Sequence, residues 1–330
     1  PVIALMISTL LHESELPHPY KTCIVLGHIC DRNGKKESKS LGNYTPPEAI
    51  LESDGADAMR WYFYAANTPW NSTRYSPEAV RQSQQEFLVK VRNVYSFFVI
   101  YANIDGFDPT VHPARPVAER DLLDRWMLSE LQLTIRDVTS HMDGYGLYEA
   151  AQRLIRLADS VSNWYVRRSR DRFWAPADTG GADKWDAYHT LYEVLTTLCQ
   201  LAGPFVPFLT EEIYRNLVLT PYPDRLESVH LTDWPEGDAS AIDEQLSEEM
   251  EAIRDIVSLG LATRAAHRLR VRQPLAEAEV ILGNPELTRR LAPYEALIAE
   301  ELNTKAVTFT QDAAGRVQFS VKPNYRALGP

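Results

Sequence analysis

The sequence predicts a mainly helical protein that opens with a short α/β segment and ends with a small α+β segment. Three observations support this prediction. Apolar residues recur with a helical period through the middle of the chain, short apolar runs broken by Gly, Asn and Pro precede residue 75, and two strand-like runs flank a helical stretch beyond residue 276. A chain of 330 residues exceeds one small core. We therefore expect three segments, 1–75, 76–235 and 236–330.

The first segment alternates short strands, turns and helices. Ile24–Leu26 predicts a short buried strand that continues weakly to Cys30, and Asp31–Gly34 predicts a turn. A polar loop follows over residues 35–43. Turns that begin with proline then lead into two predicted helices, 47–51 and 56–66.

The second segment has the pattern of a helix bundle. Ser76 and Pro77 form a helix start, with a capping hydroxyl and a proline at the first helical position. One apolar face then carries Val80, Phe87, Val91, Val94 and Phe98. Further helices are predicted at 119–141, 147–173 and 184–201, with a short one after Pro207. Long helices joined by short loops indicate a bundle.

The third segment begins with a proline-rich link that becomes acidic. A helix is predicted over 243–269, a strand over 277–282 and a helix over 285–301. Two more strands are predicted at 306–309 and 317–319. Together these elements indicate a small α+β module.

Charge and cysteine content exclude several classes of protein. With 34 basic and 45 acidic residues the net charge is −11, so a broad basic surface for coating nucleic acid is excluded, although a local basic stripe is not. No apolar run is long enough to cross a bilayer. Three cysteines without a C-x-x-C pair offer neither a disulfide framework nor a metal site. We expect a protein of the reducing cytoplasm that binds neither DNA nor a membrane.

The sharpest local pattern is the loop Lys36–Asn43, which follows the predicted strand. Two lysines, small hydroxyl side chains and a glycine permit close contact with phosphate oxygens. The alternative from the residues alone is a solvated lysine loop.

This loop resembles the KMSKS signature of the class I aminoacyl-tRNA synthetases. The flanking stretches Ile24–His28 and Asp54–Tyr62 are similar to the end of the catalytic domain in the isoleucyl, valyl and leucyl group. The isoleucyl enzymes are favoured because Ser162–Trp174 resembles their anticodon-binding helix and Val271–Leu275 is also similar to them. The resemblance runs along nearly the whole chain in the same order.

The resemblance implies a fold and a set of phosphate contacts. It implies the tail of a Rossmann-type α/β catalytic domain, then a helical anticodon-binding bundle, then a small α+β module. Lys36 and Lys39 would be catalytic, and ATP would be bound by Lys36, Ser38, Lys39 and Ser40. The usual Met of the motif is Glu37 here, which places an anion in this loop: it would either pair with Lys36 or point to solvent.

The resemblance also implies contacts with tRNA. On the anticodon helix these would come from Trp164, Arg167, Arg168, Arg170 and Arg172. The residues alone leave another interpretation, because arginines near a helix C-terminus offset the macrodipole and Trp164 has the spacing of a core residue.

Two further groups of basic residues are candidates for contact with tRNA. Arg60 would meet the inner corner of the tRNA or form a salt bridge with Asp54 or Asp57. Arg268 and Arg270 belong to a basic stripe that would approach the tRNA backbone or pair with the acidic helix before it.

The function implied is that of an isoleucine–tRNA ligase, which uses ATP with Mg²⁺ to join L-isoleucine to tRNA(Ile). No HIGH motif occurs in the sequence. We therefore expect this piece alone to be inactive, to bind no cofactor by itself, and to act mainly as a monomeric tRNA-binding part of a longer enzyme. The alternatives are a valyl-tRNA synthetase fragment and a non-catalytic, synthetase-like RNA-binding protein.

Overall fold

The computed structural model describes residues 22–176 and 180–312. The strand predicted at 317–319 lies outside this range. The chain divides into two compact units, 1–242 and 243–330, and each is treated by itself below. The segment boundaries predicted near residues 75 and 235 stay predictions.

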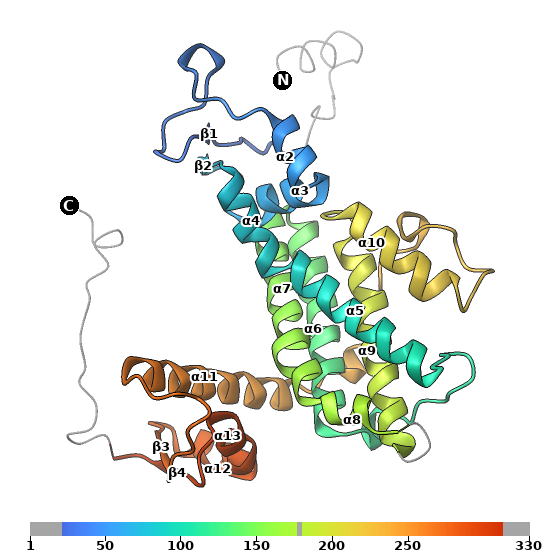
Figure 1. The fold of residues 1–330 in the computed structure, drawn as a ribbon, viewed down its shortest axis with the longest axis vertical. Coiled ribbons are helices and arrows are strands. Elements are labelled where there is room, and N and C mark those ends of the chain that lie inside the picture. Colours follow the sequence, from blue (N-terminus) through green and yellow to red (C-terminus); the bar gives the residue numbers. More distant parts are fainter. Residues whose placement is uncertain (1–21, 177–179, 313–330) are drawn as a thin grey trace, which may run out of the picture. The chain divides into compact units, whose positions relative to one another are not determined.

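A helix bundle forms the main part of the first unit (Figure 1). Its elements are α4 (Pro77–Glu86), α5 (Leu88–Asp105), α6 (Leu122–Asp143), α7 (Leu147–Asp159), the π-helix η3 (Ser160–Val166), α8 (Arg170–Trp174), α9 (Gly181–Ala202), α10 (Pro207–Tyr214) and the π-helix η4 (Arg215–Leu219). Short 3-10 turns stand at Val117–Glu119, Val229–Leu231 and Ala239–Ala241. The mainly helical fold class predicted from the sequence is confirmed.

The predicted apolar faces form the bundle core. On α6 the inward residues are Leu123, Trp126, Leu131, Ile135 and Val138, all buried. Asp121 caps this helix by accepting a hydrogen bond from the Leu123 amide at 3.0 Å. The Ser76 hydroxyl caps α4 in the same way, at 3.2 Å from the Ala79 nitrogen.

Two predicted helices are interrupted in ways the apolar period does not show. The helix expected from residue 76 onwards breaks at Phe87, which is fully buried and stacks on Trp61 with 4.0 Å between ring centroids. The helix expected over 147–173 widens into η3 at Ser160 and turns at Ser169 before α8. A π turn accommodates one extra residue, so the residues after it face other directions than an α-helix predicts.

The α/β segment contributes β1 (Ile29–Cys30), the 3-10 turn η1 (Lys39–Leu41), α2 (Pro47–Ser53), α3 (Ala56–Ala65) and β2 (Thr73–Arg74). The strands β1 and β2 are parallel, with Ile29 opposite Thr73. The prediction of a buried strand at Ile24–Leu26 is wrong, since Val25 and Leu26 are 73% and 69% exposed. A buried parallel strand needs neighbours at both edges and helices on both faces, which the described residues do not supply.

The second unit is a small α+β module. It contains α11 (Glu244–Ala266), β3 (Ala278–Ile281), α12 (Pro285–Leu291), a 3-10 turn at Ala292–Tyr294, α13 (Glu295–Leu302) and β4 (Val307–Thr310). The two strands pair in parallel with Val280 opposite Phe309, so α12 and α13 form the crossover of a β–α–β unit. Among the described residues, no helix has the length and apolarity of a membrane span.

Candidate functional site

The loop Lys36–Asn43, called the lysine loop below, is held in one shape by the side chains of Asp31, which precedes it, and Asn43, which ends it. Asp31 accepts hydrogen bonds from the Asn33 and Lys35 amides at 2.9 and 3.0 Å and from Asn43 Nδ2 at 2.9 Å. Asn43 also accepts from the Ser38 amide at 3.0 Å. These hydrogen bonds lower the pKa of Asp31, Asn43 contributing most, so the carboxylate stays ionised. The loop is therefore a closed structure on the end of β1.

The predicted phosphate-binding side chains lie on the outside of this loop. Lys36, Lys39 and Ser40 are exposed, and the Ser38 and Ser40 hydroxyl oxygens are 2.8 Å apart. The Lys39 ammonium lies 5.3 Å from the centre of the Tyr44 ring. Gly42 ends η1 with φ of 68°, a left-handed conformation that suits glycine. Two exposed cations and two neighbouring hydroxyls thus lie in one short loop, a combination that fits the oxygens of a polyphosphate.

Glu37 takes neither of the two orientations expected for it. Its side chain is half-buried, and Oε1 has no access to solvent and no hydrogen-bond partner among the described residues. Burial raises the pKa of Tyr75, and the charge of Glu37 adds to this shift. Tyr75 belongs to an apolar cluster with Ile50, Tyr62 and Val80. One oxygen of the carboxylate therefore lies inside the protein.

Arg60 joins α3 to the bundle. Its guanidinium donates to the carbonyl oxygens of Pro204 and Phe205, at 2.7 and 3.2 Å, just before α10. The salt bridges weighed as alternatives do not form: Asp54 pairs with Arg81 at 2.9 Å, and Asp57 accepts from backbone amides of α10. Arg60 is thus used within the protein.

Arg172 lies in an ion-pair network inside the bundle. Its guanidinium contacts Asp124, which is fully buried, at 2.6 Å, and Asp183 at 2.9 Å. Tyr165 donates to the same Asp124 carboxylate at 2.5 Å. Burial opposes the charge of Arg172, but Tyr165 and the two carboxylates outweigh it and raise the pKa of the guanidinium. Arg172 is held by these acids and is not available at the surface.

Other residues of the same stretch do reach the surface. Arg167 and Arg170 are exposed, and Arg167 lies 5.9 Å from the ring centre of the largely buried Trp164. Arg168 is partly buried. Trp174 is 55% exposed, with its indole nitrogen donating to Tyr101 Oη at 2.8 Å. Trp174 is not among the residues predicted from the sequence to bind tRNA, although its place just after the arginines is a signal for it.

Six of the residues predicted to bind tRNA precede residue 200 and two follow it, and they lie in different environments. Of these six, Arg167 and Arg170 are exposed, on the turn before α8 and at its start. In the second unit Arg268 and Arg270 are exposed on the loop that follows α11. The acidic residues Glu248 and Glu249 of α11 pair with Arg290, both at 3.0 Å.

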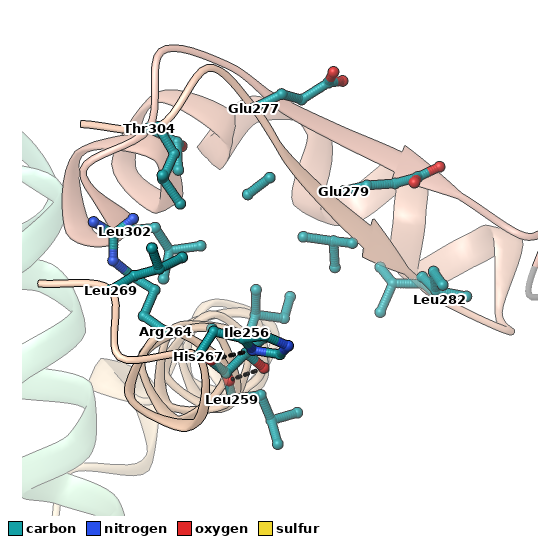
Figure 2. A pocket seen from close by; sticks show the side chains of 16 residues that line it. Ile256, Leu259, Arg264, His267, Leu269, Glu277, Glu279, Leu282, Leu302 and Thr304 are labelled. Atoms are coloured by element: carbon teal, nitrogen blue, oxygen red, sulfur yellow. Dashed lines mark hydrogen bonds between the residues drawn. The ribbon is translucent and has the colours of Figure 1, made fainter. Parts of the chain in front are cut away.

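A cavity of about 650 Å³ lies between α11 and β3 in the second unit (Figure 2). Its walls are mainly apolar, from Ile256 and Leu259 on the helix and Leu282 after the strand. The described residues hold no group of three or more His, Cys, Asp or Glu side chains placed to bind a metal ion. The exposed lysine loop and the basic surfaces therefore remain the candidate functional sites.

Comparison with known families matches both parts of this arrangement. Residues 2–73 match the family of class I tRNA synthetases for I, L, M and V, and residues 124–281 match the anticodon-binding domain of tRNA ligases. A Mycobacterium tuberculosis methionyl-tRNA synthetase, solved in complex with methionyl-adenylate, shares the fold with a TM-score of 0.50 at 19% identity, over 57% of this chain and 36% of that one.

Curated relatives are much more similar in sequence. An isoleucine–tRNA ligase of Clostridium tetani is 44% identical over 94% of this chain, and one of Deinococcus radiodurans is 43% identical over 98%. The chain spans 29% of the length of each. The two family matches agree with these relatives: the synthetase family covers the segment with the lysine loop, and the anticodon-binding family covers most of the bundle. The chain belongs to the class I aminoacyl-tRNA synthetases, and among them to the isoleucine–tRNA ligases.

Proposed function

We propose that the chain is the tRNA-binding part and the ATP-phosphate loop of an isoleucine–tRNA ligase of the cytoplasm. The whole enzyme would join L-isoleucine to tRNA(Ile) through isoleucyl-adenylate, with release of pyrophosphate and AMP. The observation that carries the proposal is the pair of exposed cationic sites in the first unit, the lysine loop and the surface of Arg167 and Arg170.

The two sites stand at opposite ends of the bundle. Figure 1 shows α8 at the end of the first unit remote from β1 and α2. The 22 residues of α6 alone span roughly 33 Å between these ends. A tRNA reaches a reaction centre and an anticodon site at the same time only if they are well separated, and this arrangement provides the separation.

At the lysine loop, the exposed ammonium groups would act on the triphosphate of ATP. Bound Mg²⁺ would add charge neutralisation on the same phosphates. Lys39 would stabilise the negative charge that grows on the leaving pyrophosphate, and Lys36 would support it. The buried Oε1 of Glu37 makes no hydrogen bond to either lysine, which leaves both ammonium groups available to the phosphates.

At the other end, Arg167, Arg170 and Trp174 would bind the anticodon loop. Guanidinium groups bind phosphates and stack on unpaired bases, and an exposed indole is a stacking surface. The hydrogen bond from Trp174 to Tyr101 fixes the ring, so little conformational entropy is lost on binding. Arg172 is left out of this surface, since Asp124 and Asp183 hold it.

Binding of tRNA(Ile) to the 330-residue chain tests the anticodon site. The affinity is compared with that for the same tRNA carrying a swapped anticodon, each at two salt concentrations. We expect a preference for the native anticodon that persists as the salt concentration rises, because base contacts, unlike phosphate contacts, are not weakened by salt. Equal and steeply salt-dependent binding of both tRNAs would refute base recognition by this surface.

Substitution in the whole ligase tests the lysine loop. We expect Lys39→Ala to slow isoleucine-dependent ATP–pyrophosphate exchange by about 10²–10³-fold, the usual loss for one donor to developing negative charge. Lys35→Ala, in the turn before the motif, is the matched control and should change the rate by less than about tenfold. Equal effects of the two substitutions would mean that the loop supplies only diffuse positive charge.

A further inference from the structure

The loop after α11 presents an unusually dense group of cations. Arg268, Arg270 and Arg272 are all exposed, and no hydrogen bond or ion pair joins their side chains to another of the described residues. Three guanidinium groups within five residues repel one another unless an anion lies between them. A long basic side chain on an exposed loop also costs little free energy when it points outward to a partner.

A fourth arginine lies underneath this loop. Arg264, on the last turn of α11, is 4% exposed. One of its terminal nitrogens, Nη2, donates to the carbonyl oxygens of Arg270 at 2.7 Å and Val271 at 3.3 Å, and also to that of Gln273. Figure 2 shows this side chain extending from α11 toward Leu302 at the edge of the cavity. The buried guanidinium therefore draws the backbone of the loop inward and leaves its arginine side chains outside.

The same loop is fixed at two further points. Asn303 Nδ2 donates to the Val271 carbonyl at 2.9 Å, and the Leu275 amide donates to the Asn303 carbonyl at 3.0 Å. Arg268 itself has φ of 56°, a left-handed conformation that is costly for a residue with a side chain. A loop tied from below in this way keeps one shape before any partner arrives, which reduces the entropic cost of binding.

We propose that Arg268, Arg270 and Arg272 form a phosphate-binding loop for the tRNA backbone, and that the buried Arg264 is the positioning residue that holds this loop in its binding shape. The proposal rests on the tRNA-binding function above and adds to it a second contact, in the other compact unit. This contact supplies affinity without reading the anticodon, because phosphates carry no sequence information.

Removal of the three surface charges tests the contact. In the triple variant Arg268→Ala, Arg270→Ala, Arg272→Ala we expect tRNA(Ile) to bind at least about tenfold more weakly, and the slope of log K against log[salt] to fall in magnitude by about 2 to 3. The ratio of affinities for native and swapped anticodons should not change. The matched control is Arg289→Ala, in the same unit, since that exposed arginine already pairs with Glu286 at 2.5 Å.

The positioning role is tested by Arg264→Lys, which keeps the charge and loses the planar guanidinium. Lysine cannot serve the same carbonyls with the same geometry, so we expect tRNA affinity to fall about three- to tenfold. The substitution should have no further effect in the triple-alanine background, because Arg264 acts only through the loop. Circular dichroism checks that the variant is folded.

Each alternative gives a different result. An unchanged salt slope in the triple variant would overturn the phosphate contact. Equal losses from Arg264→Lys in both backgrounds would overturn the positioning role and leave Arg264 as a structural residue. If the wild-type chain shows no anticodon preference but the triple variant still loses salt dependence, the anticodon proposal fails and the phosphate-binding loop stands.

Discussion

Two arginines of one short helix have different roles. Arg170 is exposed, whereas Arg172 is bound to Asp124 and Asp183 inside the bundle. Taking a guanidinium out of water is costly, and here the cost is offset because the fully buried Asp124 carboxylate, which accepts from the Tyr165 hydroxyl, would otherwise lack a cation. The first role of Arg172 is to neutralise Asp124.

We expect Arg172→Ala to lower the free energy of unfolding by about 3 to 5 kcal/mol, since the buried Asp124 carboxylate loses its cation. Urea denaturation measures the change. Arg170→Ala is the control and should stay within about 0.5 kcal/mol of the wild type. A loss of less than 1 kcal/mol for Arg172→Ala would show that water reaches Asp124.

Glu37 shows the opposite situation, a polar atom that is buried without a partner. We expect Glu37→Met to raise the free energy of unfolding by about 1 kcal/mol, because an unsatisfied oxygen is replaced by an apolar group of similar length. Glu37→Gln keeps a buried polar group and should give a smaller gain. Thermal unfolding compares the variants, and a lower midpoint for Glu37→Met would mean that the carboxylate is satisfied in solution.

Sequence patterns predicted the lysine loop better than they predicted the direction of single side chains. The loop could be found because a short local sequence defines it and its flanks. The inward turn of Glu37 depends on the packing around Tyr75, and the hold of Arg264 on the loop carbonyls depends on how the chain returns past α11. Neither leaves a periodic signal in the sequence.

At the scale of elements, α3 and α10 are joined by charges acting on backbone groups. Asp57 accepts hydrogen bonds from the Phe208 and Leu209 amides at the start of α10, at 3.3 and 2.7 Å, so it caps a helix to which it does not belong. Burial raises the pKa of Asp57, partly offset by these two amides. Arg60, one turn further along α3, donates to the carbonyls just before α10. The pair ties the segment that carries the lysine loop to the bundle.

Loss of the cap should loosen this connection. We expect Asp57→Ala to lower the free energy of unfolding by about 0.5 to 2 kcal/mol, the usual effect of removing an N-terminal cap. Hydrogen exchange of the Leu209 amide should become faster while exchange in the middle of α6 changes little. Uniformly faster exchange in both helices would show that the cap contributes only to global stability.

Helix existence was predictable from the apolar period, but helix interruptions were not. Phe87 fits the apolar face of one continuous helix, yet its stacking on Trp61 ends α4 there. The short β1–β2 pair likewise depends on residues 44 positions apart in the sequence. Such long-range contacts decide where a local pattern is overridden.

At the scale of the whole molecule, the two compact units carry different parts of the proposed tRNA contact. The anticodon surface belongs to the unit 1–242, and the phosphate-binding loop belongs to the unit 243–330. Affinity and selectivity should then be separable properties of the chain.

A chain ending at Ile242 tests this separation. We expect it to fold with the helical circular dichroism of the bundle and to keep its preference for the native anticodon, with weaker binding and a shallower salt dependence because the basic loop is gone. Titration of tRNA(Ile) and of the swapped-anticodon tRNA measures both quantities. A shortened chain that unfolds, or binds as tightly as the full one, would contradict the assignment of selectivity to the first unit and of added affinity to the second.

The π turn η3 also makes the arginine segment sensitive to the length of the chain. A π turn holds one more residue than the α turn that could replace it, and each residue of an α-helix turns the chain by about 100°. Deleting one residue within Ser160–Val166 would let an α turn replace the π turn and leave Arg172 facing Asp124, whereas inserting one would move Asp171 into the place of Arg172, with one carboxylate against another. An insertion here is therefore more damaging than a single deletion, and we expect natural variation in this stretch to change residues or remove one rather than to add one.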